Sequence, residues 1–414
     1  MKIIDRLAAS LGYGKVDARP QNVAYSDAVM DAFGVAQSGV TVSATSAMRV
    51  SAVAACVAKI SGAIVSMPLH VYQLTGDVPD RMPRDALWYL LNEQPSPQYT
   101  ASSMWEGVSM AQLLRGDAFG LIKRGVNNSV REILPLPWDS VRPMRTPGEG
   151  VRYYVSLPTH GINTWFEASE ILHFPGLGFD DATMRSMSVI QYGARNAIGN
   201  ALAMDAYSGK FFENGAHPSI ILENGKKMSD EQIAQLQAAF VAKHAGIENA
   251  HRLPLVLTEG TSAKQISLSA DDAQLLEARK FQVLDVARAF GVPGFMINES
   301  TGSTSWGSGI ESMGRGFVQY TLQPWLRKIE QELNRKLFPR DTGRFVEFYR
   351  DALIEGDLAA QGAYFRTALG GPGTGDGHMS VNEVRKIKRL APIPGGDELF
   401  RAPRDNPTTA PPAP

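Results

Sequence analysis

The pattern of apolar and polar positions is most regular between Ser269 and Phe338, where it predicts two helices joined by a polar loop. The first helix begins at residues 269–272, where acidic side chains meet the free amides of the first turn. Apolar residues then recur at helical spacing until Gly291 and Pro293 end the helix. We therefore expect a helix, a loop rich in Gly, Ser and Thr, and a second helix.

The second helix is predicted over residues 305–338 and has Pro324 in its middle. About 33 helical residues span roughly 50 Å. Proline lacks an amide proton and its ring crowds the preceding turn, so we expect a kink at Pro324 and not an end. Two pairs of opposite charge, Glu311/Arg315 and Glu332/Lys336, lie four residues apart. A long kinked helix behind a flexible loop is typical of a protein that lines a channel.

Residues 40–175 show shorter apolar segments, which predict an α+β domain with mostly antiparallel strands. The expected helices cover residues 53–67, 85–91 and 100–114, and the expected strands cover residues 69–72, 117–124, 130–136, 141–145, 151–157 and 170–174. Cys56 lies among small apolar residues of the first helix, which predicts a packed core thiol and not a nucleophile.

A long helix is predicted from Ser188 to about Asn214, and it is unusually rich in small residues. Each glycine in a helix costs roughly 1 kcal/mol against alanine, so Gly193, Gly199 and Gly209 suggest close approach to a neighbouring helix, within or between subunits. A compact α/β insert follows, with strands at 219–222 and 253–257 around a helix from Ser229.

The C-terminal part is predicted to contain a strand at 345–349, a helix at 357–369 and a helix at 381–390. The last helix opens with a capping box formed by Ser380 and Glu383. Its basic residues, from Arg385 to Arg389, are interpreted as a solvated face and not as a nucleic-acid patch. The Pro-rich stretch from residue 401 is expected to be disordered.

Composition narrows the possible functions. The 414 residues are 44% hydrophobic, enough for a sizeable core in two to four sub-domains. The net charge of −1 argues against a protein that grips DNA, but not against one through which DNA slides. A single cysteine excludes an internal disulfide and fits a reducing cytoplasm. We expect no signal peptide, no membrane span and no membrane partner.

No motif for catalysis or cofactor binding stands out. The seven histidines form no metal-binding pair, and the phosphate-binding loop and the Gly-x-Ser-x-Gly elbow are absent from the sequence. We therefore expect no catalytic, cofactor-binding or metal-binding residues. The Gly302–Gly309 stretch could bind an anion before a helix, but the pattern favours a mobile structural loop. His173, at a strand end, is interpreted as a packed or edge histidine.

Six stretches, in this order, resemble a known family. They are Val50–Val57 leading to Met67–Tyr72, Leu113–Gly120, Ile171–Phe174, Phe211–Ala216, Ala287–Pro293 and Asn382–Arg385. Together they are similar to the portal, or head–tail connector, proteins of tailed double-stranded-DNA bacteriophages of the long-tailed type. The resemblance runs from about residue 40 to residue 400, and it is carried by the ordered set and not by a single motif.

This resemblance implies an α+β portal fold with a ring of identical subunits, typically a dodecamer, around an axial channel. The sequence is accordingly divided into a flexible N-terminal arm (1–38), wing (39–187), first stem helix (188–213), clip (214–268), second stem helix (269–290), tunnel loop (291–304), kinked channel-side helix (305–338), return strand (339–352), short crown (353–400) and disordered tail (401–414).

By the same resemblance, the ring would occupy one capsid vertex, where DNA is packaged and ejected, after assembly in the host cytoplasm. The implied partners are double-stranded DNA, the terminase large subunit, a head–tail adaptor and the major capsid or scaffold protein. The tunnel-loop residues expected to face DNA are Asn298, Glu299, Ser300, Thr301, Ser303 and Thr304. The clip residues expected to face the terminase or adaptor are Glu223, Asn224, Lys226 and Lys227.

Two other functions remain open at this stage. The chain could be a hydrolase that uses Ser303 or Ser305 with His173. It could also be a different ring or scaffold protein, such as a capsid component, although the expected order of stem, clip and stem argues against this.

Overall fold

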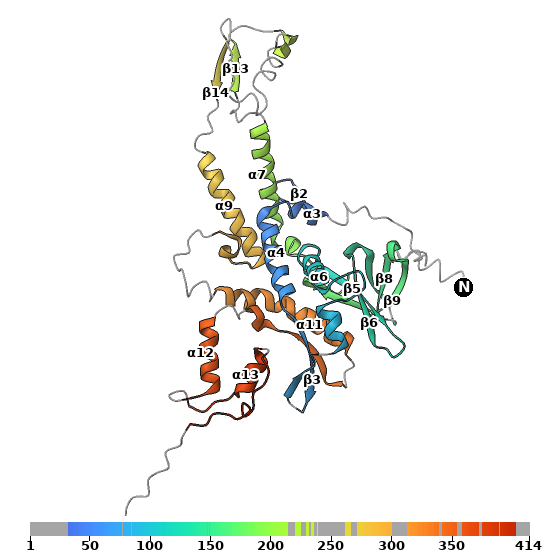
Figure 1. Cartoon of the computed structure of the whole chain (residues 1–414). Helices are drawn as coiled ribbons and strands as arrows, with labels where there is room; N and C mark the ends of the chain where they lie inside the picture. Colours follow the sequence, from blue (N-terminus) through green and yellow to red (C-terminus); the bar gives the residue numbers. More distant parts are fainter. Residues whose placement is uncertain are drawn as a thin grey trace, which may run out of the picture. The chain divides into compact units, whose positions relative to one another are not determined.

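The structure is a computed structural model. It describes residues 32–76, 78–83, 85–146, 148, 150–213, 220–224, 229–231, 233–235, 238, 261–265, 271–299, 313–338, 342–353, 358–371, 375–388 and 390–402. The chain divides into two units (Figure 1). Unit 1 comprises Met1–Val65 and Leu69–Phe348, and unit 2 comprises Ser66–Pro68 and Tyr349–Pro414.

Unit 1 begins with elements of the predicted α+β domain, and all of its strand pairs are antiparallel among the residues described. The helices here are α3 (Ala44–Ala47), α4 (Ser51–Ser66), α5 (Ala86–Asn92) and α6 (Ala101–Arg115), with short turns at η1 (Trp138–Ser140) and η2 (Pro158–His160). The strands are β1 (Ala32–Val35), β2 (Thr41–Ser43), β3 (Leu69–Thr75), β4 (Val78–Arg81), β5 (Asp117–Arg124), β6 (Val130–Leu136), β7 (Val141–Thr146), β8 (Gly150–Leu157), β9 (Ile162–Glu167), β10 (Ile171–Pro175), β11 (Leu177–Asp180) and β12 (Arg185–Met187). The α+β prediction is confirmed.

The rest of unit 1 holds the long helices. They are a π-helical turn η3 (Ile190–Ala194) that leads into α7 (Arg195–Glu213), then α9 (Asp271–Phe290), the turn η5 (Gly294–Ile297), a second π-helical segment η6 (Phe317–Leu322) and α11 (Gln323–Leu337). The strands are β13 (Ile220–Asn224), β14 (Thr261–Gln265) and β15 (Arg344–Phe348). Unit 2 contains η8 (Arg350–Leu353), α12 (Leu358–Leu369) and α13 (Val381–Ile387).

Three sheets of three strands form the body of unit 1. Their orders are β10-β5-β6, β15-β3-β4 and β7-β8-β9. The first and third sheets share a core, because the inward faces of β5, β6, β8 and β10 contribute to one apolar cluster. That cluster contains Phe119, Leu121, Leu134, Leu136, Val141, Tyr153, Val155 and Ile171. Helix α6 packs on β5.

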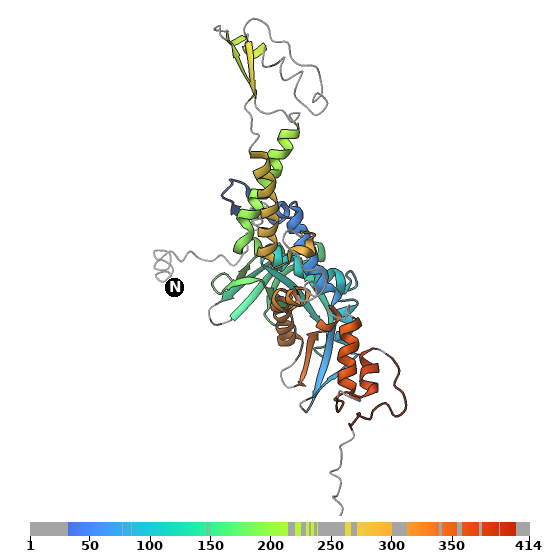
Figure 2. The same ribbon diagram turned by 90° about the vertical axis from the view of Figure 1, so that its left-hand side faces the viewer.

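The helices α7 and α9 pack side by side, as Figures 1 and 2 show from two directions. Asp205 on α7 and Arg279 on α9 form an ion pair at 2.5 Å. Both side chains are about half exposed, so screening by water makes this pair a weak stabiliser. The polypeptide between the two helices includes the β13–β14 hairpin.

Several sequence predictions need correction. Strand β1 pairs with β2, so the predicted arm is ordered at its C-terminal end from Ala32. Strands β4, β9, β11 and β12 were not predicted, because they are short or rich in charged and polar residues. The strand expected at 253–257 lies outside the described residues, and the strand that pairs with β13 is β14.

The three glycines of the helix predicted from Ser188 differ in their surroundings within the chain. A Cβ on Gly199 would lie 2.2 Å from the Cβ of Ala36, in the loop that joins β1 to β2. Gly193 and Gly209 have nothing within 4 Å of such a Cβ. Within the chain the close approach is therefore at Gly199 and involves the β1–β2 connection, and approach to a helix of another subunit stays a prediction.

Replacing Gly199 by Ala should destabilise the protein by about 1–3 kcal/mol, because the added methyl group overlaps a buried one. Replacing Gly209 by Ala is the matched control. It should leave stability unchanged or raise it by up to about 1 kcal/mol, since alanine is the better helix former. The denaturation midpoint of both variants at one protein concentration checks this expectation. Equal midpoints would contradict it.

The buried thiol of Cys56 should be chemically silent in the native protein. Its side chain is fully buried, and burial raises the pKa of the thiol to about 12. The thiol is therefore protonated at neutral pH and a poor nucleophile. A disulfide reagent should label no thiol in the folded protein at pH 8 and one per chain in denaturant. Rapid labelling without denaturant would count against the packed-core assignment.

Candidate functional site

The described part of the predicted tunnel loop begins where α9 ends. Gly291 adopts φ +68°, a left-handed conformation that favours glycine, and Val292 N–H donates to the carbonyl of Ala287. The hydroxyl of Thr321 donates to the carbonyl of Gly291 at 2.5 Å. A Cβ at position 291 would lie 3.0 Å from that hydroxyl oxygen. The loop therefore starts at a tight contact with the π-helical segment η6.

The next turn fixes the two predicted DNA-facing residues that the structure describes. Asn298 ends η5 with φ +61°, a conformation that asparagine tolerates better than most residues. Glu299 N–H donates to the carbonyl of Gly294 at 2.9 Å. The backbone thus turns back on itself at the base of the loop. Of the other predicted loop residues, Ser300, Thr301, Ser303 and Thr304 lie outside the described residues.

Just before Pro324, where a kink is predicted, the helix changes from π-helical to α-helical. Residues 313–316 are helical, 317–322 are π-helical, and α11 begins with Gln323 and Pro324. Gln323 N–H bonds to the carbonyl of Val318, five residues back, where an α-helix would reach four back. Proline has no N–H to donate to the carbonyl of Tyr320, so the wider turn fits the sequence. Residues 305–312 of the predicted helix lie outside the described part.

Helix α11 is held to strand β10 by a row of charged side chains spaced four residues apart. The Glu332 carboxylate accepts from His173 N–H at 2.8 Å and from Lys336 Nζ at 2.5 Å. Lys336 also bonds to the carbonyl of Ile171, and Lys328 bonds to the carbonyl of Gly176. Burial lowers the pKa of both lysines, which the nearby carboxylates oppose. Lys328, Glu332 and Lys336 therefore supply hydrogen-bond partners to the backbone groups on the edge of β10 that does not pair with β5, and to Gly176 just beyond it.

A second row on α11 does the same for strand β15. Glu330 is fully buried, and its Oε1 accepts from Phe348 N–H at 3.0 Å. The Asn334 side chain accepts from Val346 N–H at 2.7 Å and donates to the Val346 carbonyl at 3.0 Å. One helix therefore completes the edges of two sheets. Sequence reasoning found the Glu332/Lys336 pair but not its role, because its spacing also fits an exposed ion pair.

His173 lies in a closed polar cluster and not in an open site. Its side chain is 5% exposed; Nε2 lies 3.0 Å from Asp117 Oδ1, and Nδ1 lies 3.2 Å from the Tyr153 hydroxyl. Burial, with the Glu332 carboxylate second, raises the pKa of Tyr153 to about 12. Asp117 also accepts from Ser186 N–H and faces Arg185 at 3.8 Å. The interpretation of His173 as a packed residue is confirmed.

The hydrolase alternative gains no geometric support. Both ring nitrogens of His173 are engaged by other side chains, and Ser303 and Ser305 lie outside the described residues. Within the part of the chain that the structure describes, no group of three His, Cys, Asp or Glu side chains could hold a metal ion. The same residues include no helix long and apolar enough to cross a membrane.

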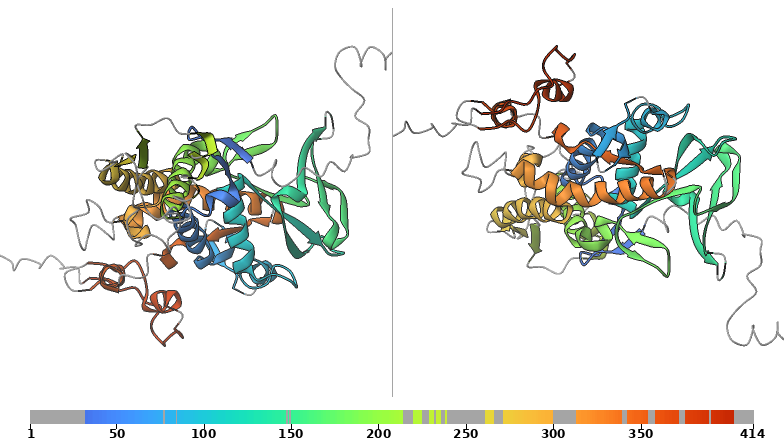
Figure 3. Two further views of the ribbon diagram at one scale, coloured as in Figure 1. Left: turned by 90° about the horizontal axis from the view of Figure 1, so that it is seen from above. Right: turned by 90° about the horizontal axis from the view of Figure 1, so that it is seen from below.

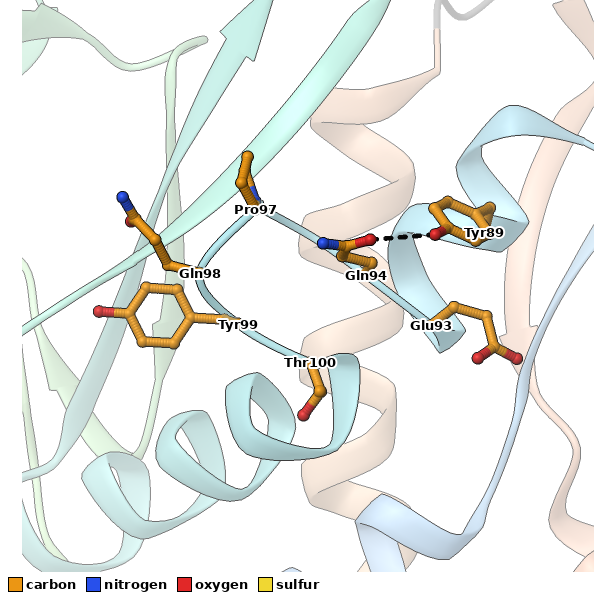
Figure 4. Close-up of a pocket in the computed structure, with 7 residues that line it drawn as sticks. All are labelled: Tyr89, Glu93, Gln94, Pro97, Gln98, Tyr99 and Thr100. Carbon is orange, nitrogen blue, oxygen red and sulfur yellow. Dashed lines mark hydrogen bonds between the residues drawn. The ribbon is translucent and has the colours of Figure 1, made fainter.

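One surface hollow of about 280 Å³ lies between α5 and α6 (Figure 4). It is lined by Tyr89, Glu93, Gln94, Pro97, Gln98, Tyr99 and Thr100. The Tyr89 hydroxyl donates to Gln94 Oε1 at 3.0 Å, as the dashed line in Figure 4 marks. These side chains pair no nucleophile with a base, so the hollow offers no arrangement for catalysis.

The predicted clip residues lie partly in the β13–β14 hairpin. Glu223 pairs with Ser262 and Asn224 pairs with Thr261 across the two strands. Lys226 and Lys227 lie outside the described residues. The backbone therefore places Glu223 and Asn224 at one end of a two-stranded ribbon.

Comparison with known proteins decides the family. The family model described as "Phage portal protein" matches residues 51–388 of this chain. The chain belongs to the phage portal protein family. This portal chain is 34% identical to a probable portal protein of Streptomyces phage phiC31 over 388 residues, which covers 92% of this chain and 83% of the relative. It is also 34% identical to the portal protein of Enterobacteria phage HK97 over 360 residues, covering 86% and 82%.

Solved structures show the same fold. An HK97-family phage portal protein from Corynebacterium diphtheriae superposes with a TM-score of 0.55 at 16% identity, covering 76% of this chain and 96% of that one. A chain in the neck of a native gene transfer agent particle, computed with C12 symmetry, gives a TM-score of 0.54 at 22% identity, covering 84% and 94%. The predicted portal fold is confirmed. The phage portal family consists of structural proteins of the virus particle.

Replacing Glu332 by Ala should destabilise this portal chain by about 3–5 kcal/mol, because it leaves Lys336 and the His173 amide buried without their shared acceptor. Replacing Arg335 by Ala removes another contact to the same carboxylate, but from a side chain that is 66% exposed. That control should cost less than about 1 kcal/mol. Thermal melts at one protein concentration compare the two. Similar losses in both variants would show that the buried row is not the main support.

Proposed function

We propose that this chain forms a closed ring of identical subunits, about a dozen in number, which is the DNA channel at one vertex of a phage capsid. Membership of the portal family is the observation that carries the proposal. The neck structure with C12 symmetry, which shares the fold, supports a ring. The division into arm, wing, stem, clip, tunnel loop, channel-side helix, return strand, crown and tail is part of the same proposal.

In this ring the tunnel loop would face the channel. The loop base supports this role, because the Gly291–Thr321 contact and the turn at Asn298 anchor its start against a helix. Asn298, Glu299, Ser300, Thr301, Ser303 and Thr304 would then meet passing DNA through shape and weak polar contacts, without reading bases. A near-neutral net charge suits a channel in which phosphates must not bind tightly.

The partners follow from the same arrangement. A terminase large subunit would drive DNA through the ring from the clip, and a head–tail adaptor would take its place afterwards. Glu223, Asn224, Lys226 and Lys227 would lie at this contact. The shell or scaffold protein would surround the wing. Assembly would take place in the host cytoplasm, and the finished ring would reside in the virion.

The first test is the assembly state of the purified protein. Native mass spectrometry should give a mass of about a dozen chains, and negative-stain images should show a closed ring with a central hole. A protein that remains monomeric even when it is expressed with the shell and scaffold proteins would overturn the proposed ring.

The second test addresses the loop. Deleting Asn298 to Ser303 should leave the ring intact but lower packaged or retained DNA by about tenfold or more, since the contacts to DNA are lost. The control is a loop of equal length in which Gly and Ser replace these residues. It should retain most of the packaged DNA, because the loop keeps its length. Normal packaging by the deletion variant, with rings confirmed by mass, would remove the loop from the mechanism.

A further inference from the structure

The β7-β8-β9 sheet has two edges that differ in how the sequence protects them. Strand β7 contains Pro143 between Arg142 and Arg145, and proline with charge is a usual defence of an exposed edge. Strand β9 reads Ile-Asn-Thr-Trp-Phe-Glu, with no proline and no basic residue. Its composition favours strand pairing. Among the described residues, β8 is the one strand that pairs with β9, so the other edge of β9 carries no strand.

Elsewhere in unit 1, two other sheet edges are covered by side chains. Helix α11 supplies partners to β10 through Glu332 and Lys336, and to β15 through Glu330 and Asn334. In the part of the chain that the structure describes, the outer edge of β9 has no such cover, and an uncovered edge is a template for another extended chain.

The backbone of β9 can be oriented from its last residue. Glu167 N–H bonds to the Glu170 carboxylate at 2.9 Å, and its carbonyl accepts from Glu170 N–H at 3.0 Å. Both groups therefore point away from β8. In a regular antiparallel pair, residues two apart direct their main-chain groups the same way. The pairing of β8 with β9 has no register shift, so Asn163 and Trp165 present their N–H and C=O groups to the open edge.

The sheet face beside this edge has the composition of a protein contact. Its outward rows are Arg142–Tyr154–Trp165 and Met144–Arg152–Glu167. Trp165 and Met144 are 39% and 45% exposed. The rings of Tyr154 and Trp165 lie 5.1 Å apart, and the Arg152 guanidinium lies 5.8 Å from the Trp165 ring centre. Tyr, Trp, Arg and Met are the residues enriched at interfaces.

The position of β9 within unit 1 limits what could cover it. The strands β8 and β9 lie at the opposite end of the unit from α9 and the loop base, as Figure 1 and both views of Figure 3 show. In the ring proposed above, with the loop at the axis, β9 therefore lies at the outer rim. A protein outside the ring would meet it there, and not the channel contents.

We propose that β9 pairs with an extended segment of the capsid-shell protein that surrounds the portal vertex. The segment adds a fourth strand at Asn163 and Trp165. On the face it shares with Trp165 it carries an apolar side chain, because its neighbour there is the partly exposed Trp165 ring. This inference rests on the proposed ring.

The test uses two variants at one position. Asn163→Pro removes the outward N–H, whereas Asn163→Ala keeps it and loses only the side-chain contact with Tyr154. Each full-length variant is expressed with the shell and scaffold proteins of the same virus. We expect both to form rings of wild-type mass, but Asn163→Pro should reduce the portal content of purified shells by about tenfold or more, and Asn163→Ala should not. Wild-type incorporation of the proline variant overturns the proposal.

Hydrogen exchange gives a second, independent reading. The amides of Asn163 and Trp165 should exchange quickly in isolated rings and slowly in rings seated in shells. Protection already present in isolated rings would assign the edge to a neighbouring subunit and overturn the proposal. Failure of the wild-type protein to form a ring would instead reject the proposed function, so the two failures are distinguishable.

Discussion

The structure of unit 1 depends on how α11 satisfies the backbone of two sheets at once. Strands β10 and β15 each expose an edge whose N–H and C=O groups would cost free energy if they were buried without partners. Buried carboxylates and an amide on α11 accept from these edges, and two lysines donate to the carbonyls in and beside β10. Burying such charges is expensive, but each of these contacts also replaces water at a backbone group. The helix therefore fixes the distance between the sheets as well as their orientation.

The sequence allowed much of the fold to be predicted, because its strongest signals are local. The periodicity of α4, α6, α7 and α9, the capping box at Ser380 and the hairpin around Asn128 all depend on residues close in the chain. The same reasoning missed β9, whose apolar residues do not alternate regularly with polar ones, and β11, which has only four residues. It also did not find the contact of Gly199 within the chain, because Ala36 lies about 160 positions earlier.

The candidate site was predicted less completely than the fold. The end of α9 and the start of the predicted loop could be located from Gly291 and Pro293, while the run of Ser and Thr after residue 299 lies outside the described residues. The Thr321 contact and the buried cluster around His173 could not, since both join residues that are distant in sequence. A histidine at a strand end gives no sign of whether it faces solvent or an aspartate such as Asp117. Long-range pairing of this kind becomes visible only in the folded chain.

The π-helical segment before Pro324 has a further consequence for how this region tolerates change in length. A π turn holds one more residue than an α turn. Losing a single residue between Phe317 and Leu322 would let the segment close to an α-helix, and the residues upstream would keep their orientation around the axis. The orientation of Met313 to Gly316 relative to α11 therefore survives the loss of one residue in this segment, whereas a loss within α11 would turn one side of the helix by about 100° relative to the other.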